Sequence, residues 1–274
     1  MLPSIQTLYQ AARGIPLPLP ARLSEAYGGD LAFPRGGTPH VFANFVSTID
    51  GIVSYGIPGA ASARHISRGH AGDRFVMGLL RAAADLVISG SGTLRVEKKV
   101  AWTPWQIFPD AADLYRELRS ARGLPERVRV AILSASGDLD LGAPVFSSPE
   151  VEPWIVTSHA GARRIGPTER VRVLEVGEET PTMRDAIDAL ARDAGSRLIL
   201  SEAGPALFGR MLEEGVVHEL FLTIAPQLAG RSAGRRGVGL VDPVAFAPER
   251  APWGELISVK RSDSYLLLRY ALGT

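Results

Sequence analysis

The stretch Leu86-Val87-Ile88-Ser89-Gly90-Ser91-Gly92-Thr93 joins a short apolar run to a glycine-rich turn. The run predicts a buried β-strand, and the turn would bring backbone N–H groups and hydroxyls close to a phosphate. The turn is not a dinucleotide fingerprint, because Arg95 stands in place of a third glycine, and it is not a P-loop, because no Gly-Lys-Ser/Thr follows. A tight turn without a ligand explains the pattern equally well.

A second stretch has the same character, Leu198-Ile199-Leu200-Ser201-Glu202-Ala203-Gly204-Pro205-Ala206-Leu207. It predicts a strand, a turn of small residues and a helix, and Pro205 suits the first helical position. The free N–H groups of such a helix attract anions. Glu202 would accept hydrogen bonds from substrate or ribose hydroxyls, or orient a ligand. Its alternative role is to cap the helix, which is favourable by about 0.3–1 kcal/mol.

Outside these stretches, strand-like and helix-like segments alternate along the chain. This order predicts an α/β fold with a mixed, mostly parallel central sheet flanked by helices. The last two strands should form a hairpin that adds antiparallel edges. Strands are expected at 41–46, 86–88, 128–133, 154–157, 171–176, 198–200, 219–224, 255–260 and 265–270, and helices at 73–83, 110–121, 183–194 and 206–214. Ligands bind at the carboxyl ends of strands in such sheets, where both turns lie.

Residues 1–39 are interpreted as an N-terminal arm that packs on the core, and residues 40–274 as one domain. Residues 4–12 could form a short helix, whereas the prolines within 15–20 exclude one there. Gly28-Gly29 and Gly36-Gly37 predict turns.

The composition excludes several classes of protein. The 274 residues carry a net charge of +1, so no global field favours nucleic acid or an anionic membrane. The chain has no cysteine, which excludes disulfides, thiolate zinc sites and a cysteine nucleophile. It shows no signal peptide and no apolar run of roughly 18–20 residues, so we expect a cytoplasmic protein without a membrane span. Five histidines show no metal-ligand spacing, and no metal site is expected.

A third stretch, Asn44-Phe45-Val46-Ser47-Thr48-Ile49-Asp50-Gly51, places polar groups at the end of an apolar strand. Considered alone, Asp50-Gly51 is best explained as a hairpin turn.

The order and spacing of the three stretches resemble the reductase domain of riboflavin biosynthesis, the C-terminal half of the bacterial bifunctional deaminase–reductase. Five motifs carry the resemblance, from about residue 40 to the C-terminus: Thr48-Ile49-Asp50-Gly51, Leu80-Arg81-Ala82, the turn from Asp85 to Thr93, Glu202 to Leu207, and Val217 to Pro226.

The resemblance implies a dihydrofolate-reductase-like fold, a homodimer, and NADPH-dependent reduction of a ribosylaminouracil phosphate to its ribityl form. Asp50 and Glu202 would be catalytic, with Asp50 handling a proton or orienting the substrate, and Arg81 would bind the substrate phosphate. The residues implied to face the substrate are Asn44, Ser47, Asp50, Arg81 and Glu202. Those implied to bind NADPH are Val46, His65, Gly90, Ser91, Gly92, Thr93, Arg95, Glu97, Ala203, Gly204, Pro205, Ala206, Leu207 and Phe208.

Two departures from the family bear on the substrate. The usual Asp-Asp-Pro-x-Leu-Thr-x-Arg segment is replaced after Glu97 by a segment with Lys98-Lys99, Trp102 and Trp105. The tryptophans could stack on a heterocycle or bury the insertion. No deaminase half is expected within these residues, because its zinc motif needs cysteine and the sequence has none. Two alternatives therefore stay open: a reductase of the same fold acting on a pterin, dihydrofolate or another heterocycle, and a non-catalytic nucleotide-binding module. The basic stretch 230–237 is interpreted as a solvated loop, with a phosphate clamp as its alternative.

Overall fold

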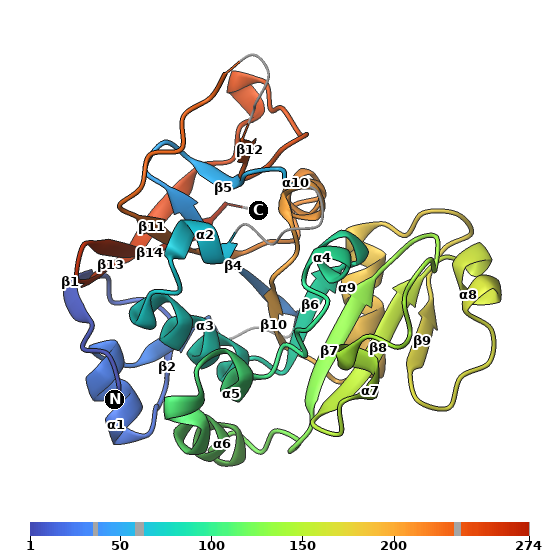
Figure 1. Ribbon diagram of the computed structural model, residues 1–274, viewed down its shortest axis with the longest axis horizontal. Coiled ribbons are helices and arrows are strands. Elements are labelled where there is room, and N and C mark those ends of the chain that lie inside the picture. Colours follow the sequence, from blue (N-terminus) through green and yellow to red (C-terminus); the bar gives the residue numbers. More distant parts are fainter. Residues whose placement is uncertain (35–37, 58–62, 233–236, 274) are drawn as a thin grey trace.

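A ten-stranded mixed sheet runs through the computed structural model (Figure 1), which describes residues 1–34, 38–57, 63–232 and 237–273. In spatial order its strands are β1 (Gln6–Gln10), β13 (Gly254–Ser262), β14 (Tyr265–Leu272), β11 (Glu219–Ala225), β4 (His40–Thr48), β10 (Leu198–Ser201), β6 (Leu86–Gly90), β7 (Val128–Leu133), β8 (Val151–Thr157) and β9 (Arg172–Glu175). The strands from β11 to β9 are parallel, and β14, β13 and β1 extend the sheet by antiparallel pairing. The predicted fold class and the closing hairpin are confirmed.

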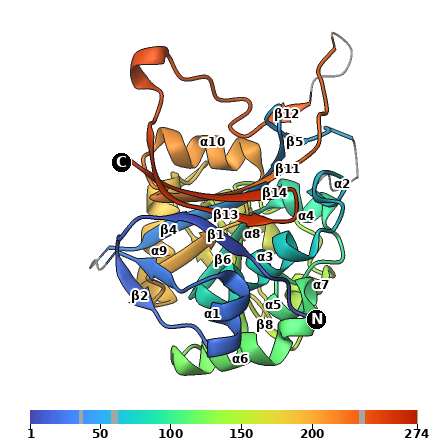
Figure 2. The same ribbon diagram turned by 90° about the vertical axis from the view of Figure 1, so that its left-hand side faces the viewer.

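Helices cover both faces of this sheet (Figures 1 and 2). One face carries α1 (Ala21–Tyr27), α3 (Ala71–Ala83), α5 (Pro104–Ile107), η1 (Pro109–Ala111), α6 (Ala112–Ala121) and α7 (Pro144–Ser147). The other carries α9 (Met183–Asp193) and α10 (Pro205–Glu213). The remaining helices are α2 (Ala63–Ser67), α4 (Ser91–Val96), α8 (His159–Ile165) and η2 (Pro248–Arg250). Two large apolar cores result, one on each side of the sheet, and a smaller cluster gathers Ile66, Ala225 and Tyr265.

The helix α3 lines the candidate active site, and its sequence explains its position. Phe75 and Leu79 recur at helical spacing and are fully buried against the sheet. The ring of His70 accepts a hydrogen bond from the N–H of Asp73 and so caps the helix. Gly78 allows close packing on α6, because a Cβ there would lie 2.7 Å from Tyr115. The helix is thus fixed along its length, and the face that does not pack stays free for a ligand.

Two short sheets lie outside the main one, β2 (Ile15–Leu17) with β3 (Leu31–Phe33), and β5 (Ile52–Ser54) with β12 (Val238–Gly239). The turn predicted at Asp50-Gly51 is present, because the N–H of Gly51 donates to the carbonyl of Thr48 at 3.0 Å. It does not close a hairpin, since β5 pairs with β12 rather than with β4. The reason is that β4 already has β10 and β11 as neighbours, which leaves it no free edge.

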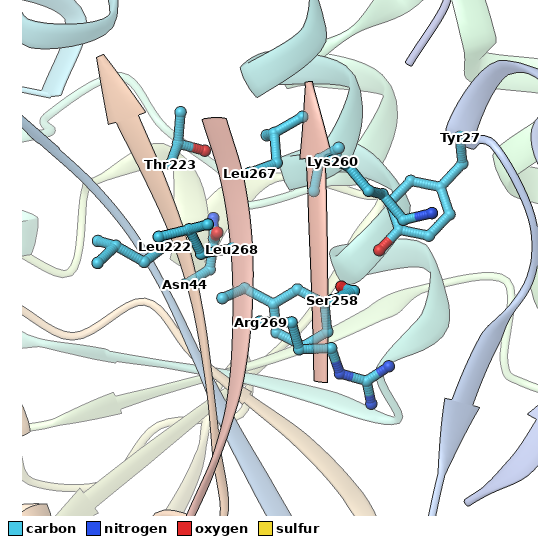
Figure 3. Close-up of a pocket in the computed structure, with 11 residues that line it drawn as sticks. Tyr27, Asn44, Leu222, Thr223, Ser258, Lys260, Leu267, Leu268 and Arg269 are labelled. Atoms are coloured by element: carbon cyan, nitrogen blue, oxygen red, sulfur yellow. The ribbon is translucent and has the colours of Figure 1, made fainter. Parts of the chain in front are cut away.

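The N-terminal arm joins the main sheet. The helix expected over residues 4–12 is instead strand β1, because the open edge of β13 satisfies the backbone of Gln6–Gln10. Beneath it, the ammonium of Lys260 donates to the hydroxyl of Thr7 (2.7 Å) and to the carbonyl of Gly28 (2.9 Å). The same ammonium lies 4.3 Å from the ring centre of Tyr27, beside a cavity of about 10 Å³ (Figure 3). A buried cation therefore fastens the arm to the sheet.

The structure describes some of the turns and loops that the sequence predicts, but not all of them. Gly28 and Gly29 both have positive φ and form the predicted turn after α1. The predicted Gly36-Gly37 turn and residues 233–236 of the basic stretch lie outside the described residues, whereas Arg231 is exposed. Across the described part of the chain, no helix has the length and apolar character that a membrane span requires.

Candidate active site

The two glycine-containing turns meet at one edge of the sheet. Strands β6 and β10 are parallel neighbours, and the N–H of Glu202 donates to the carbonyl of Ile88 at 2.9 Å. Beyond the strands, a Cβ added to Gly204 would lie 3.3 Å from the hydroxyl of Thr93. The turns thus form one continuous surface, as expected from the carboxyl ends of adjacent parallel strands.

Next to these turns opens a cleft of about 780 Å³, a size that suits a small organic ligand. Its walls come from α3, from β4 and β5, from α2, from the segment that contains α5, and from both turns. The sequence-predicted residues that line it are Asn44, Val46, Arg81, Thr93, Glu97, Glu202, Ala203, Gly204 and Pro205. Residues from all three quoted stretches are therefore brought together.

Other predicted residues lie outside this lining: Ser47, Asp50, His65, Gly90, Ser91, Gly92, Arg95, Ala206, Leu207 and Phe208. The Ser47 hydroxyl is buried and donates to the carbonyl of Thr48. His65 and Arg95 are exposed on their short helices α2 and α4. Phe208 is buried and packs on Phe45 with ring centres 4.9 Å apart.

Arg81 and Glu202 are paired with each other at the base of the cleft. The guanidinium donates from Nε to Oε1 at 2.8 Å and from Nη2 to Oε2 at 2.6 Å, and both side chains are buried. A third donor, Nη1, reaches the carbonyl of Thr103 at 3.3 Å. The alternative role of Glu202 as a helix cap is wrong, because no side chain caps α10 and the carboxylate is committed to Arg81.

Asp50 lies in the loop after β4, and its carboxylate is fully engaged. One oxygen accepts hydrogen bonds from the hydroxyl of Thr48 (2.6 Å) and the N–H of Ala229 (3.0 Å). The other accepts the N–H of Gly230 at 2.7 Å. These bonds hold the pKa of Asp50 well below its usual range, the Thr48 hydroxyl contributing most. The arrangement indicates that Asp50 fixes the loop after β11 and stays ionised.

Asp73, which the sequence analysis did not select, lies in the first turn of α3 and lines the cleft. Protein atoms crowd its carboxyl group, and this desolvation raises its pKa despite hydrogen bonds from Thr223 and Ser67. The sequence does contain a pattern that could have identified this acid. Asp73, Met77 and Arg81 are spaced four residues apart, which places the acid on the same helix face as the arginine. Function was not apparent because a helix-starting Asp is common.

Two further carboxyl groups, those of Glu97 and Glu202, line the cleft together with Asp73. Glu97 lines the cleft after α4, and its pKa is raised by burial, an effect that Arg81 partly offsets and Glu202 reinforces. Glu202 also raises the pKa of Asp73. The deep part of the cleft therefore combines three acids with one arginine, and like-charge repulsion favours protonation of the acids that are not ion-paired. Among the residues that the structure describes, no group of three His, Asp or Glu side chains is arranged to hold a metal ion.

The segment that replaces the usual substrate wall closes one side of the cleft. Trp102 is 2% exposed, adopts φ +55°, and lines the cleft together with Gln106 of α5. Trp105 instead packs away from it, with the guanidinium of Arg116 4.6 Å above its ring. One tryptophan can thus contact a ligand and the other buries the insertion.

The two turns have the features that a nicotinamide dinucleotide requires of its phosphate site. The N-terminus of α10 has no side-chain cap, and its first residue is Pro205. A Cβ added to Gly92 would meet no atom within 4 Å, so space remains beside the α4 turn. A backbone cradle of small residues with an uncapped helix N-terminus fits an anionic pyrophosphate.

The strand order and the placement of the cleft define an α/β protein with a dihydrofolate-reductase-like fold. The RibD C-terminal domain model matches residues 39–259, and the chain belongs to this family. No curated protein sequence matched the chain.

Solved structures share the fold. A pyrimidine reductase-like protein from Corynebacterium diphtheriae is 21% identical with a TM-score of 0.62, over 86% of this chain and 92% of that one. The riboflavin biosynthesis reductase Rib7 of Saccharomyces cerevisiae is 15% identical with a TM-score of 0.61, over 88% and 93%. RibD of Acinetobacter baumannii is 20% identical with a TM-score of 0.60, over 87% of this chain but 59% of its own length.

Proposed function

We propose that this protein is an NADPH-dependent reductase that converts the ribosyl group of 5-amino-6-(5-phosphoribosylamino)uracil, or of a related pyrimidine, to ribityl. The observation that carries the proposal is the meeting of Thr93 and Gly204 beside the 780 Å³ cleft, in a chain of the RibD family. The family resemblance also supports a homodimer and a cytoplasmic location.

The residues that would hold NADPH come from both turns. Val46, Thr93 and Glu97 would line the nicotinamide end, and the backbone from Gly204 to Phe208 would receive the phosphates. When bound, NADPH supplies a hydride to the imine carbon of the ring-opened ribosylamine. The chain itself must hold that carbon in place and exclude water, a role that suits the buried Trp102 and the Arg81–Glu202 pair.

Hydride addition to the imine carbon also requires a proton on the imine nitrogen. We assign this proton to Asp73, because its raised pKa keeps the acid form present at higher pH than an ordinary aspartate. Asp50 is a poorer donor, since its hydrogen bonds to Thr48, Ala229 and Gly230 favour the ionised form.

A second candidate substrate is a pterin or dihydrofolate. The specific observation is again Asp73, whose crowded carboxyl group can pair with the adjacent N–H and NH₂ donors of a 2-aminopyrimidine ring. A uracil presents a carbonyl oxygen instead of the amino group and would need the protonated acid as donor. The remodelled wall around Trp102 is compatible with either ring.

The test measures oxidation of NADPH with the ribosylaminouracil phosphate and, in parallel, with dihydrofolate, and repeats both with NADH. Turnover of the first substrate supports riboflavin-type reduction, and turnover of dihydrofolate alone supports the second candidate. Tight NADPH binding without turnover of either would favour a nucleotide-binding module and contradict the proposal.

A further inference from the structure

Apolar side chains line one side of the cleft. Met77 of α3, Val100 of the connection between α4 and α5, and Ile107 of α5 are half-buried and line the cleft. Trp102 lines it with them and is 2% exposed. Val100 and Ile107 pack on the apolar core that contains Trp102, and α5 packs against α3. These four side chains form an apolar wall that two separate segments of the chain build together.

The backbone around Trp102 is fixed on both sides. Trp102 has φ +55°, an uncommon conformation for a residue with a bulky side chain. Before it, the N–H of Ala101 donates to Oε1 of Gln106 at 2.7 Å. After it, the carbonyl of Thr103 accepts a hydrogen bond from Nη1 of Arg81 at 3.3 Å. Such strain persists only where the surroundings enforce it, so these bonds hold the indole in the cleft wall.

The apolar wall has little capacity for hydrogen bonds. The amide of Gln106 lies at the same cleft but is engaged within its own loop, because Oε1 accepts from Ala101 and Nε2 donates to the carbonyl of Lys99 at 3.0 Å. The indole N–H of Trp102 can donate but cannot accept. A hydroxyl-rich chain against this wall would lose hydrogen bonds to water without replacing them, whereas a flat aromatic ring would gain by leaving water. The wall therefore suits an aromatic group rather than a polyol.

We propose that the apolar wall binds an uncharged aromatic ring that is attached to the heterocycle in the deep part of the cleft. Asp73, Met77 and Arg81 share one face of α3, so the wall begins one helical turn from the acid that would meet the heterocycle. The inference rests on the proposed function and adds the class of ligand, a pyrimidine or related heterocycle with an aromatic substituent. Gln106 is a positioning residue, since it acts on the ligand through the loop that carries Trp102.

The binding test compares two uncharged probes, 6-(benzylamino)uracil and 6-(methylamino)uracil, which share the heterocycle and differ in the aromatic ring. Each is titrated calorimetrically into the protein, with and without NADP⁺. We expect the benzyl probe to bind at least about tenfold more tightly, because its ring leaves water for the apolar wall. Equal affinities, or no binding of either probe, would overturn the inference.

Two variants locate the ring. Val100→Thr keeps the β-branched shape but places a hydroxyl in the wall, and Met77→Gln introduces an amide. Each should weaken binding of the benzyl probe about five- to tenfold and leave the methyl probe unchanged, because only the ring covers the new polar group. The matched control is Val173→Thr, a half-buried valine on the edge strand β9, which should change neither affinity (Figure 1). Full benzyl affinity in both cleft variants would place the ring elsewhere and overturn the inference.

Gln106→Ala tests the positioning role. Gln106 is exposed, so the unfolding midpoint should stay unchanged, whereas the benzyl probe should bind about fivefold more weakly and the methyl probe equally well. Equal losses for both probes would contradict that role. The proposed function fails separately. Absence of NADPH oxidation with every substrate would contradict the proposed reaction, and a preference for the benzyl probe would still support the ring site.

Discussion

Arg81 and Glu202 form a two-point ion pair that joins the last turn of α3 to the residue that follows β10. The two residues are 121 positions apart in the chain, and both are almost fully removed from water. Desolvation of two charges is costly, so the pair is weak evidence for net stability, but loss of one partner leaves the other uncompensated. The pair therefore fixes the geometry of the cleft base.

Glu202→Ala should lower the free energy of unfolding by about 3–5 kcal/mol, because the Arg81 guanidinium would remain buried without a counter-charge. The measurement is urea unfolding. The control is Glu152→Ala, which breaks the partly exposed pair with Arg129 and should cost only about 0–1 kcal/mol. Equal losses in the two variants would show that burial does not set the strength of these pairs.

Gly204→Val should abolish NADPH binding, because the added side chain would fill the gap beside the Thr93 hydroxyl, 3.3 Å from the Cβ position. The fold should tolerate the change, since Gly204 has φ −68° and ψ 170°, which any residue can adopt. Binding is followed by nicotinamide fluorescence, and the unfolding midpoint checks the fold. Undiminished affinity in a folded variant would mean that the phosphates bind elsewhere.

Asp73→Asn should lower kcat at least about a hundredfold with a small change in KM, as expected for loss of a general acid. In the wild type, kcat should fall as pH rises through the raised pKa of Asp73, because donation requires the protonated form. Asp50→Asn distinguishes the two candidate acids. A larger loss of kcat in Asp50→Asn than in Asp73→Asn would identify Asp50 as the proton donor.

Thr223→Val should shift the fall in kcat with pH to higher pH values. The Thr223 hydroxyl hydrogen-bonds to the Asp73 carboxylate and so lowers its pKa, and removing it leaves desolvation less opposed. A purely structural role for Thr223 would lower kcat equally at all pH values without moving the limb. The pH profile, rather than the rate at one pH, is therefore the measurement.

Lys260 should make stability depend on pH above neutrality. Burial, reinforced by Arg269, lowers its pKa to about 8 from 10.5. Between these values the unfolded chain binds more protons than the native one, so the free energy of unfolding should rise with pH across this window, by about 1–3 kcal/mol. Lys260→Met should lose this rise. Parallel pH profiles of wild type and variant would show that Lys260 titrates alike in both states.

The elements predicted most accurately from sequence are those with strong local signals. The uniformly apolar run at 86–88 and the Pro205 start of α10 were correctly placed, because burial on both faces and the missing proline N–H act within a few residues. The prediction failed for residues 4–12, where the free edge of β13 determines the structure. At Asp50-Gly51 the turn was correct but the hairpin was not, since the neighbours of β4 come from distant parts of the chain.

The sequence by itself determined the fold class, the two turns and the family, because hydrophobic periodicity, glycine positions and ordered motifs are local properties. Tertiary structure alone decided which polar groups meet. It paired Arg81 with Glu202, engaged Asp50 in a loop, and brought Asp73 of α3 next to Thr223 of β11. Ion pairing and desolvation depend on packing between segments far apart in the chain, and no local pattern encodes them.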